Sequence, residues 1–131
     1  MNTNPKKEKI FVTGSTGFIG YNFIKRAIKK GYEIKALRRN KLIKFNSEIN
    51  NKIEFIDGSI ENFNQKSLEG CNILVHLAAS GVGPKKADLK ELLLVNVLGT
   101  SKIIESAYKA KIEKIIVVGT CHEYGDVDLS N

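Results

Sequence analysis

A glycine-rich loop between a short β-rich run and an amphipathic stretch constrains the fold of this chain more than any other feature. The run Lys-Ile-Phe-Val-Thr at residues 9–13 leads directly into the loop, and apolar side chains recur at helical spacing from residue 19 to residue 28. A strand, a glycine turn and a helix in immediate succession predict the first βα unit of a parallel sheet. The loop consists of Gly14, Ser15, Thr16, Gly17, Phe18, Ile19 and Gly20.

Each glycine of this loop has its own physical reason. Gly14 permits a tight turn, Gly17 lets backbone amides approach a bound anion, and Gly20 lets the helix pack closely on the strand. The amides and the positive dipole at a helix N-terminus hold phosphate groups, so the loop predicts a site for the pyrophosphate of a dinucleotide. A tight turn without a ligand is the alternative that the pattern leaves open.

The rest of the chain continues the alternation of strands and helices. We expect strands at 33–37, 53–56, 73–77 and 114–118, at most a short helix within 38–51, one or two helical turns within 63–68, and a long helix at 87–110. Right-handed crossovers then favour an α/β fold, a doubly wound parallel sheet of the Rossmann type with strand order 3-2-1-4-5. Its ligand would bind at the carboxyl ends of strands 1 and 4. The long helix is apolar nearly all round, so we expect it to be covered on more than one side.

The charge of the chain bears on its partners. The 131 residues carry a formal net charge of +7, as a binder of nucleic acid or of an anionic membrane surface would. Only three of the 21 basic residues are arginines, however, the lysines are scattered, and no aromatic side chains alternate with them to stack bases. We therefore interpret the charge as solvated surface with a mild attraction for phosphate, and we expect no nucleic-acid partner.

The sequence shows neither a membrane span nor a disulfide framework. The longest apolar run, 115–119, is far too short to cross a bilayer, and no apolar stretch follows the lysine-rich start as it would in a secretory signal. The two cysteines, Cys71 and Cys121, lack the spacing of metal ligands. We expect a cytoplasmic protein with free thiols, no metal site and no membrane partner.

Four motifs, in order along the chain, give a resemblance to a known family. They are Thr-Gly-x-x-Gly-Phe-Ile-Gly at 13–20, His-Leu-Ala-Ala at 76–79, Asn-Val-Leu-Gly-Thr at 96–100 and Gly-Thr-Cys-His-Glu-Tyr-Gly at 119–125. On these residues the chain resembles the NAD-dependent epimerase/dehydratase family, the extended branch of the short-chain dehydrogenase/reductases. The resemblance covers nearly the whole chain but only the N-terminal part of a typical member.

The resemblance implies positions for cofactor binding and catalysis. Leu77, Ala78 and Ala79 would line the ribose and pyrophosphate of the cofactor. Thr120 matches the family's catalytic Ser/Thr, whose hydroxyl donates a hydrogen bond where negative charge develops. Capping of the strand end is the alternative for Thr120. Asn96 matches the buried helix asparagine of the family, and a purely structural role is equally open for it.

Two departures from the family pattern concern the cofactor. Arg38 and Arg39 stand where NAD-preferring members carry an acidic residue at the end of strand 2. Because a guanidinium suits a 2′-phosphate, Arg38 favours NADP over NAD. Ser59, followed by Ile60, occupies the place of the aspartate that meets the adenine amino group in many relatives, and both residues are expected at the cofactor.

A third departure concerns the reaction. Cys121 and His122 stand where the dehydratases of the family usually carry Asp-Glu, so reductase or epimerase chemistry on a nucleotide sugar fits better than dehydration. His122 is a candidate acid or base near neutral pH, and an ordinary loop histidine is the alternative.

The family's proton-donating tyrosine and its partner lysine would lie beyond residue 131. We therefore expect residues 1–131 to be one truncated NAD(P)-binding domain without the C-terminal substrate-binding region, and to be inactive alone. The whole protein would be an NAD(P)-dependent epimerase or reductase of nucleotide sugars, and a non-catalytic NAD(P)-binding regulatory module is the alternative. By the same resemblance, helix 87–110 would form a homodimer interface.

Overall fold

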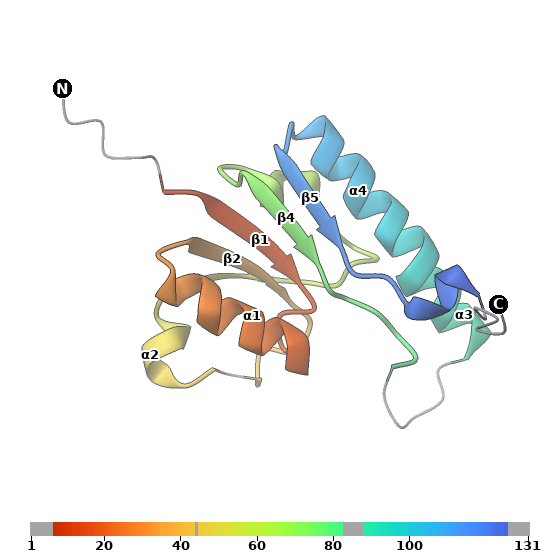
Figure 1. Ribbon diagram of the computed structural model, residues 1–131, viewed down its shortest axis with the longest axis horizontal. Helices are drawn as coiled ribbons and strands as arrows, with labels where there is room; N and C mark the ends of the chain where they lie inside the picture. The colour runs from red at the N-terminus through yellow and green to blue at the C-terminus, as the bar shows by residue number, and fades with distance from the viewer. Residues whose placement is uncertain (1–6, 44, 83–87, 126–131) are drawn as a thin grey trace, which may run out of the picture.

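The computed structural model describes residues 7–43, 45–82 and 88–125, which build a five-stranded parallel sheet (Figure 1). Its strands are β1 (Lys9–Thr13), β2 (Glu33–Arg38), β3 (Ile53–Asp57), β4 (Ile73–His76) and β5 (Lys114–Val117). They lie in the order β3-β2-β1-β4-β5, which confirms the predicted doubly wound topology.

The centre of the sheet is formed by β1 and β4, and these strands are mostly apolar because both of their faces are covered. Phe11 and Leu74 are fully buried. The two strands pair in parallel, and the register ends with Thr13 opposite His76. The last residues of both strands therefore lie side by side at the carboxyl edge of the sheet, where the glycine loop begins.

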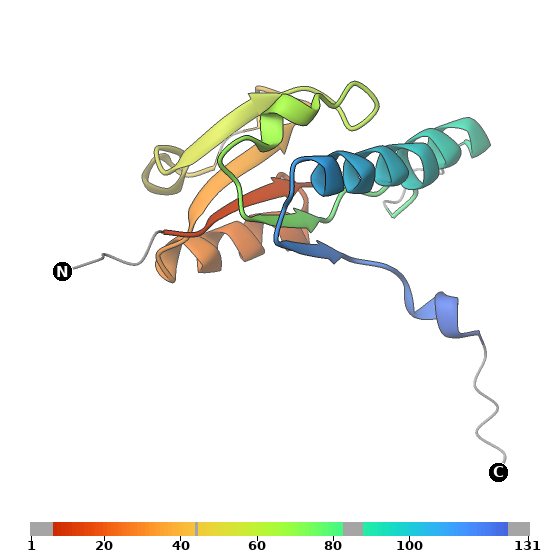
Figure 2. The ribbon, with the colours of Figure 1, turned by 90° about the horizontal axis from the view of Figure 1, so that it is seen from above.

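Helices cover both faces of this central region, as the view from above in Figure 2 shows. α1 (Phe18–Lys29) packs against the face that carries Ile10 and Val12, and α4 (Thr100–Lys109) packs against the face that carries Phe11. The alternation of side chains along a strand divides the apolar residues between two cores, one under each helix layer.

Two short helical turns lie where the sequence predicts no more than that. α2 (Ser47–Asn50) begins after Asn46, and the 3₁₀ turn η1 (Gln65–Leu68) begins after Asn64. In both turns the asparagine side chain accepts a hydrogen bond from a backbone amide of the first turn, at 3.0 and 2.9 Å. Asparagine is a favoured cap because its side chain satisfies one of these amides.

The predicted long helix is present as three consecutive segments, namely α3 (Leu89–Leu92), the π-helical segment η2 (Leu93–Gly99) and α4. Asp88 caps its start, since its carboxylate accepts a hydrogen bond from the Glu91 amide at 2.7 Å. The predicted start at residue 87 lies outside the described residues. π-helical turns are frequent at functional sites, and this one carries Asn96 at its middle.

One expectation about this helix differs from the structure. Its outer side is open in the described part of the chain, because no other described element packs there. Val97 is 52% and Leu98 is 60% exposed, and the residues of β5 are exposed as well. Among the described residues, no helix combines the length and the apolar character needed to cross a membrane.

Candidate functional site

The glycine loop turns at the carboxyl edge of β1 and opens α1. The Gly17 amide donates a hydrogen bond to the Gly14 carbonyl oxygen at 3.1 Å, and no side chain of the described residues caps the helix. The first turn of α1 contains no acidic residue. The first amides and the helix dipole therefore present positive potential at the loop, which is the arrangement that binds a phosphate group.

Two glycines of the loop are required by close backbone contacts. Gly14 has a φ of +66°, and a Cβ on it would lie 2.6 Å from the Leu77 carbonyl carbon and 2.7 Å from the Ala78 nitrogen. A Cβ on Gly20 would collide with the Gly14 carbonyl oxygen. The loop thus lies directly against the segment that follows β4, and α1 lies directly against the loop.

A cavity of about 250 Å³ opens beside the loop. Its lining contains these expected cofactor-binding residues: Gly14, Ser15, Thr16, Gly17, Ile60, Leu77, Ala78 and Ala79. It also contains residues that the sequence did not single out as ligands, namely Leu37, Arg39, Glu61, Val82 and Val95. The structure therefore brings most of the expected residues into one concave site of the kind that binds small molecules.

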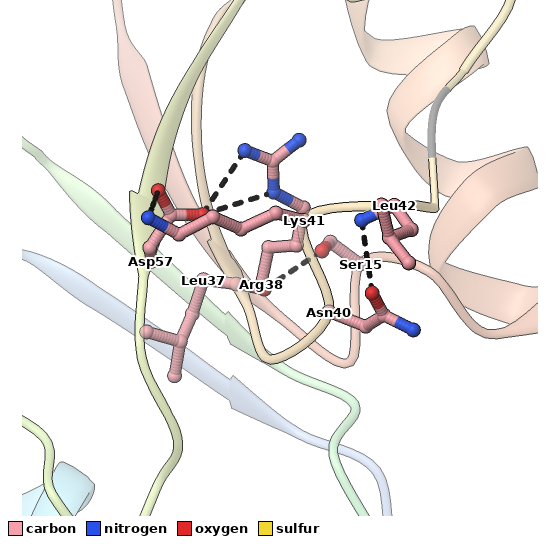
Figure 3. Close-up of polar contacts among 7 residues, drawn as sticks. All are labelled: Ser15, Leu37, Arg38, Asn40, Lys41, Leu42 and Asp57. Carbon is pink, nitrogen blue, oxygen red and sulfur yellow. Dashed lines mark hydrogen bonds and ion pairs between the residues drawn. The ribbon is translucent and has the colours of Figure 1, made fainter.

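Several expected residues lie outside that lining, namely Phe18, Ile19, Gly20, Arg38 and Ser59. Phe18 and Ile19 are exposed on the first turn of α1, and Gly20 is buried beneath the loop. The Ser15 hydroxyl, inside the lining, donates to the Leu37 carbonyl oxygen at 2.7 Å (Figure 3), which ties the loop to the end of β2.

The Arg38 side chain, at the end of β2, contacts residues of β3 (Figure 3). Its Nε and Nη2 donate to Oδ1 of Asp57 at 3.1 and 3.0 Å, and its guanidinium lies 4.2 Å from the centre of the Phe55 ring. Lys41 Nζ lies 3.3 Å from the other oxygen of Asp57. The hydrogen bond from Arg38, followed by that from Lys41, holds the pKa of Asp57 below its ordinary value. Arg38 therefore joins two strands and does not face the cavity.

Arg39, one residue later, lines the cavity in its place. Leu37 and Arg39 line the cavity and Arg38 does not; β2 ends at Arg38, and Arg39 belongs to the bend that follows the strand. The sequence singled out Arg38 for the 2′-phosphate, whereas the residue of the pair that lines the cavity is Arg39.

Glu61 is a second charged residue of the lining that the sequence analysis missed. Lys102 Nζ donates to the Glu61 carbonyl oxygen at 3.0 Å, which fixes this segment to α4. A hydrogen bond from the Ser59 side chain, one from the backbone of Glu61 and the charge of Arg39 lower the pKa of the Glu61 carboxyl. Ser59, expected at the adenine, thus interacts with a residue of the lining without being part of it.

The segment after β4 is held from the π-helical turn. Asn96 Oδ1 accepts from the Ser80 amide at 2.8 Å, and Asn96 Nδ2 donates to the Ser80 carbonyl oxygen at 3.0 Å. The Ser80 hydroxyl donates to Glu91 Oε1 at 2.6 Å. These contacts fix the chain that continues from the cavity lining, and they favour the structural one of the two roles considered for Asn96.

The expected catalytic residues follow β5. Thr120 is exposed and does not line the cavity, and its amide donates to Glu123 Oε1 at 3.1 Å. The side chain of His122 lies outside the described part of the structure. Within residues 7–43, 45–82 and 88–125 there is no group of three or more His, Cys, Asp or Glu that could hold a metal ion.

The pattern of the NAD dependent epimerase/dehydratase family matches residues 10–130. The chain belongs to this family. The match confirms the resemblance that the four motifs gave, and it places the chain in the N-terminal, NAD(P)-binding part of the family's fold.

Curated relatives of the chain include a reductase and an epimerase. Dihydroflavonol 4-reductase of Solanum lycopersicum is 30% identical over 122 residues, which cover 86% of this chain and 32% of the relative. UDP-glucose 4-epimerase of Rickettsia rickettsii is 29% identical over 122 residues, 85% of this chain and 36% of the relative. The solved structure of MoeE5 in complex with UDP-glucose and NAD superposes with a TM-score of 0.77 and 29% identity, over 92% of this chain and 39% of that one. The chain spans about a third of the length of the curated relatives it matches.

Proposed function

We propose that this chain is the cofactor-binding part of an NAD(P)-dependent epimerase or reductase that acts on a nucleotide sugar. The observation that carries the proposal is the cavity at the glycine loop, where a helix N-terminus and a concave lining meet at the carboxyl ends of the central strands. Two relatives support the substrate class, since MoeE5 was solved with UDP-glucose and NAD and the Rickettsia rickettsii relative is a UDP-glucose 4-epimerase.

The lining offers separate contacts for the parts of a dinucleotide. The amides of the glycine loop and of the first turn of α1 bind the pyrophosphate. Leu37 and Ile60 provide apolar surface for the adenosine on the β2 side, where the ribose of a dinucleotide lies in this kind of sheet. Leu77 and Ala79 line the part of the cavity next to β4, where the nicotinamide half of the dinucleotide would lie. The nicotinamide, when bound, supplies the hydride acceptor or donor of the reaction.

Thr120 and His122 are the residues that we propose for the chemistry. Both follow β5 at the same edge of the sheet as the glycine loop. The Thr120 hydroxyl donates a hydrogen bond to the substrate oxygen on which negative charge develops. His122 accepts or donates a proton near neutral pH.

We propose NADP as the preferred cofactor, with Arg39 as the residue that recognises it. Arg39 lines the cavity at the end of β2, where the 2′ position of the adenosine ribose lies in this kind of sheet. A guanidinium binds a phosphate through two parallel hydrogen bonds, which a free 2′-hydroxyl does not match.

We also propose that the long helix forms a homodimer interface. Its exposed apolar side chains include Leu89, Leu93, Leu94, Val97, Leu98, Ile104 and Tyr108. An apolar patch on a helix that no other described element covers favours association with a partner surface of the same kind.

A fluorescence titration with NADH and NADPH tests the function. We expect saturable binding of both, tighter for NADPH, and displacement by ADP-ribose, which shares the pyrophosphate. Thr16→Asp places a negative charge in the lining and is expected to weaken binding about tenfold or more, because it repels the phosphates. Ser101→Asp, on the exposed side of α4, is the matched control and is expected to bind as the wild type does. Absence of saturable binding by either dinucleotide would contradict the proposed function.

A further inference from the structure

A buried series of hydrogen-bonded side chains connects the ends of β1 and β4 with the start of α4. Thr13 Oγ1 lies 2.6 Å from Nδ1 of His76, and Nε2 of the same ring lies 2.9 Å from Thr100 Oγ1. The Leu77 and Ala78 amides both donate to Thr13 Oγ1, at 3.2 and 3.3 Å. Thr13 and His76 are almost completely buried.

The number of hydrogen-bond donors and acceptors among these side chains and amides determines which nitrogen of the His76 ring carries the hydrogen. A hydroxyl offers one hydrogen and two lone pairs. The amides of Leu77 and Ala78 occupy both lone pairs of Thr13 Oγ1, so its hydrogen is directed to Nδ1 of His76. Nδ1 is therefore the acceptor, and the neutral ring carries its hydrogen on Nε2, from where it donates to Thr100.

The Thr13 hydroxyl holds a contact on which the cavity depends. Gly14 follows Thr13, and its backbone lies so close to Leu77 and Ala78 that a Cβ on Gly14 would overlap both. The Leu77 amide has the Thr13 carbonyl oxygen as a second acceptor, at 3.3 Å. Within the described residues, the Ala78 amide has the Thr13 hydroxyl as its one acceptor, so the position of Ala78 depends on that hydroxyl more strongly than the position of Leu77 does.

We propose that His76, in its neutral form with hydrogen on Nε2, is a positioning residue for cofactor binding. Its Nδ1 accepts a hydrogen bond from the Thr13 hydroxyl, which leaves both lone pairs of that oxygen for the Leu77 and Ala78 amides and fixes one wall of the cavity against the glycine loop. The inference rests on the proposed function, because it concerns the same cavity.

Protonation of the ring reverses the role of Nδ1. A hydrogen on Nδ1 must point to Thr13 Oγ1, which then receives three donors for two lone pairs, and the Ala78 amide loses its acceptor. The hydrogen-bond partners of the ring are Thr13 from β1 and Thr100 from α4, Val117 of β5 is opposite His76 in the sheet register, and none of these residues is charged. Burial alone lowers the pKa of His76. The neutral form is therefore the stable one at neutral pH, and acid opens the contact.

Nitrogen NMR of the chain labelled with ¹⁵N-histidine tests the assignment without any cofactor. We expect Nδ1 of His76 to resonate as an unprotonated ring nitrogen and Nε2 as a protonated one at neutral pH. The chain contains two histidines, so His122→Gln identifies the signals of His76 by removing the other set. Hydrogen on Nδ1, or rapid exchange between both forms, would overturn the inference.

Calorimetric titration measures the affinity for NAD between about pH 5 and about pH 7.5 and tests the positioning role. NAD is used instead of NADP because it lacks the 2′-phosphate, which itself titrates near pH 6. His76→Asn places a neutral amide oxygen near the position of Nδ1, so we expect it to keep the wild-type affinity within about threefold and to remove the loss of affinity in acid. His76→Gln extends past that position and leaves the Thr13 hydroxyl without its acceptor, so we expect affinity to fall about fivefold or more.

The outcomes separate the inference from the proposed function. Absence of NAD binding by the wild type at every pH would contradict the proposed function and, with it, the positioning role. Wild-type binding that does not weaken in acid, or that weakens equally in His76→Asn, would overturn the inference and leave the proposed function standing. Thermal unfolding of each variant controls for folding, and the wild-type pH profile decides even where His76→Gln does not fold.

Discussion

Arg39 and Glu61 bring opposite charges into the lining of one cavity, and the charge of Arg39 adds to hydrogen bonds from the Ser59 side chain and the Glu61 backbone in holding the pKa of the Glu61 carboxyl below its ordinary value. Arg38, the neighbour of Arg39 in sequence, has its guanidinium on Asp57 and over the Phe55 ring. Two consecutive arginines thus serve different parts of the molecule, one the cavity and the other the pairing of β2 with β3.

Arg39→Ala and Arg38→Ala are therefore expected to have separable effects. Arg39→Ala should lower the affinity for NADP about tenfold or more and the affinity for NAD by less than about threefold, because only the 2′-phosphate loses a charged partner. Arg38→Ala should lower the urea midpoint of unfolding and leave the ratio of the two affinities unchanged. Two results would contradict the assignment of NADP to Arg39. One is a ratio of NADP to NAD affinity that changes in Arg38→Ala and not in Arg39→Ala. The other is a wild type that binds NAD more tightly than NADP and loses this preference in Glu61→Gln.

Gly14→Ala should be far more damaging than an alanine at another glycine with positive φ. At Gly14 the φ is +66° and the new Cβ would lie 2.6 Å from a Leu77 backbone atom, so we expect a loss of more than about 3 kcal/mol of stability, or no folding. Gly31, with a φ of +90° and no atom within 4 Å of its added Cβ, is the matched control, and its alanine variant should lose about 1 kcal/mol. Urea unfolding measures both, and equal losses would show that the close contact with Leu77 is absent.

The free energy of unfolding should fall as the solution becomes mildly acidic. Burial lowers the pKa of His76 from its ordinary value of 6.5, so below that pH the unfolded chain binds a proton that the folded chain resists. The stability due to neutral His76 is complete above this pH and declines as the pH falls toward the lower folded pKa. A hydrogen bond from Lys9 is the main cause that lowers the pKa of the Glu54 carboxyl. This group therefore changes the free energy of unfolding only below its ordinary pKa of 4.5.

Urea unfolding at about pH 7.5 and about pH 5.5 isolates the contribution of the histidine. The wild type should be less stable at the lower pH, and His76→Asn, which does not titrate there, should show a smaller difference. A pH dependence unchanged in His76→Asn would assign the effect to other groups.

The proposed dimer predicts a concentration-dependent mass. Leu98, which is 60% exposed on η2, should be part of the contact, so Leu98→Asp should yield a monomer in sedimentation equilibrium, because it buries a charge in an apolar interface. Ser47→Asp, at an exposed position of α2 on the other face of the sheet, controls for added charge. A wild-type chain that stays monomeric at the highest concentration reached would remove the proposal.

The sheet could be predicted from the sequence because its signals are local. The run 9–13 gives β1 with the bounds Lys9–Thr13, and the apolar run from Ile73 predicts β4 within a residue of its end. The glycine loop fixes the direction of the first crossover, and right-handed connections then leave few strand orders. The tight turn and the close helix packing predicted for the loop also explain why positions 14 and 20 require glycine.

Other features depend on contacts that no local pattern encodes. The π-helical turn at Leu93–Gly99 has the composition of an ordinary apolar helix, and only its contact between Asn96 and Ser80 distinguishes it. The role of Arg38 depends on Asp57, which lies 19 residues away in sequence and reaches it only through the pairing of β2 with β3. Asp57-Gly58 marks a turn after β3 in the sequence, but nothing local shows that the segment after it, whose Ile60 packs in the core with α4, brings Glu61 into the lining.

The measurement that tests the central claim most directly is a titration of the ¹⁵N-labelled chain with NADP, followed by the shifts of its backbone amides. Binding at the glycine loop predicts shifts concentrated at residues 14–17, 37–39, 60–61 and 77–79, and predicts that Thr16→Asp strongly reduces them at a cofactor concentration near the wild-type Kd. Shifts spread over the lysine-rich surfaces, or no saturable shift at the loop, would contradict the account.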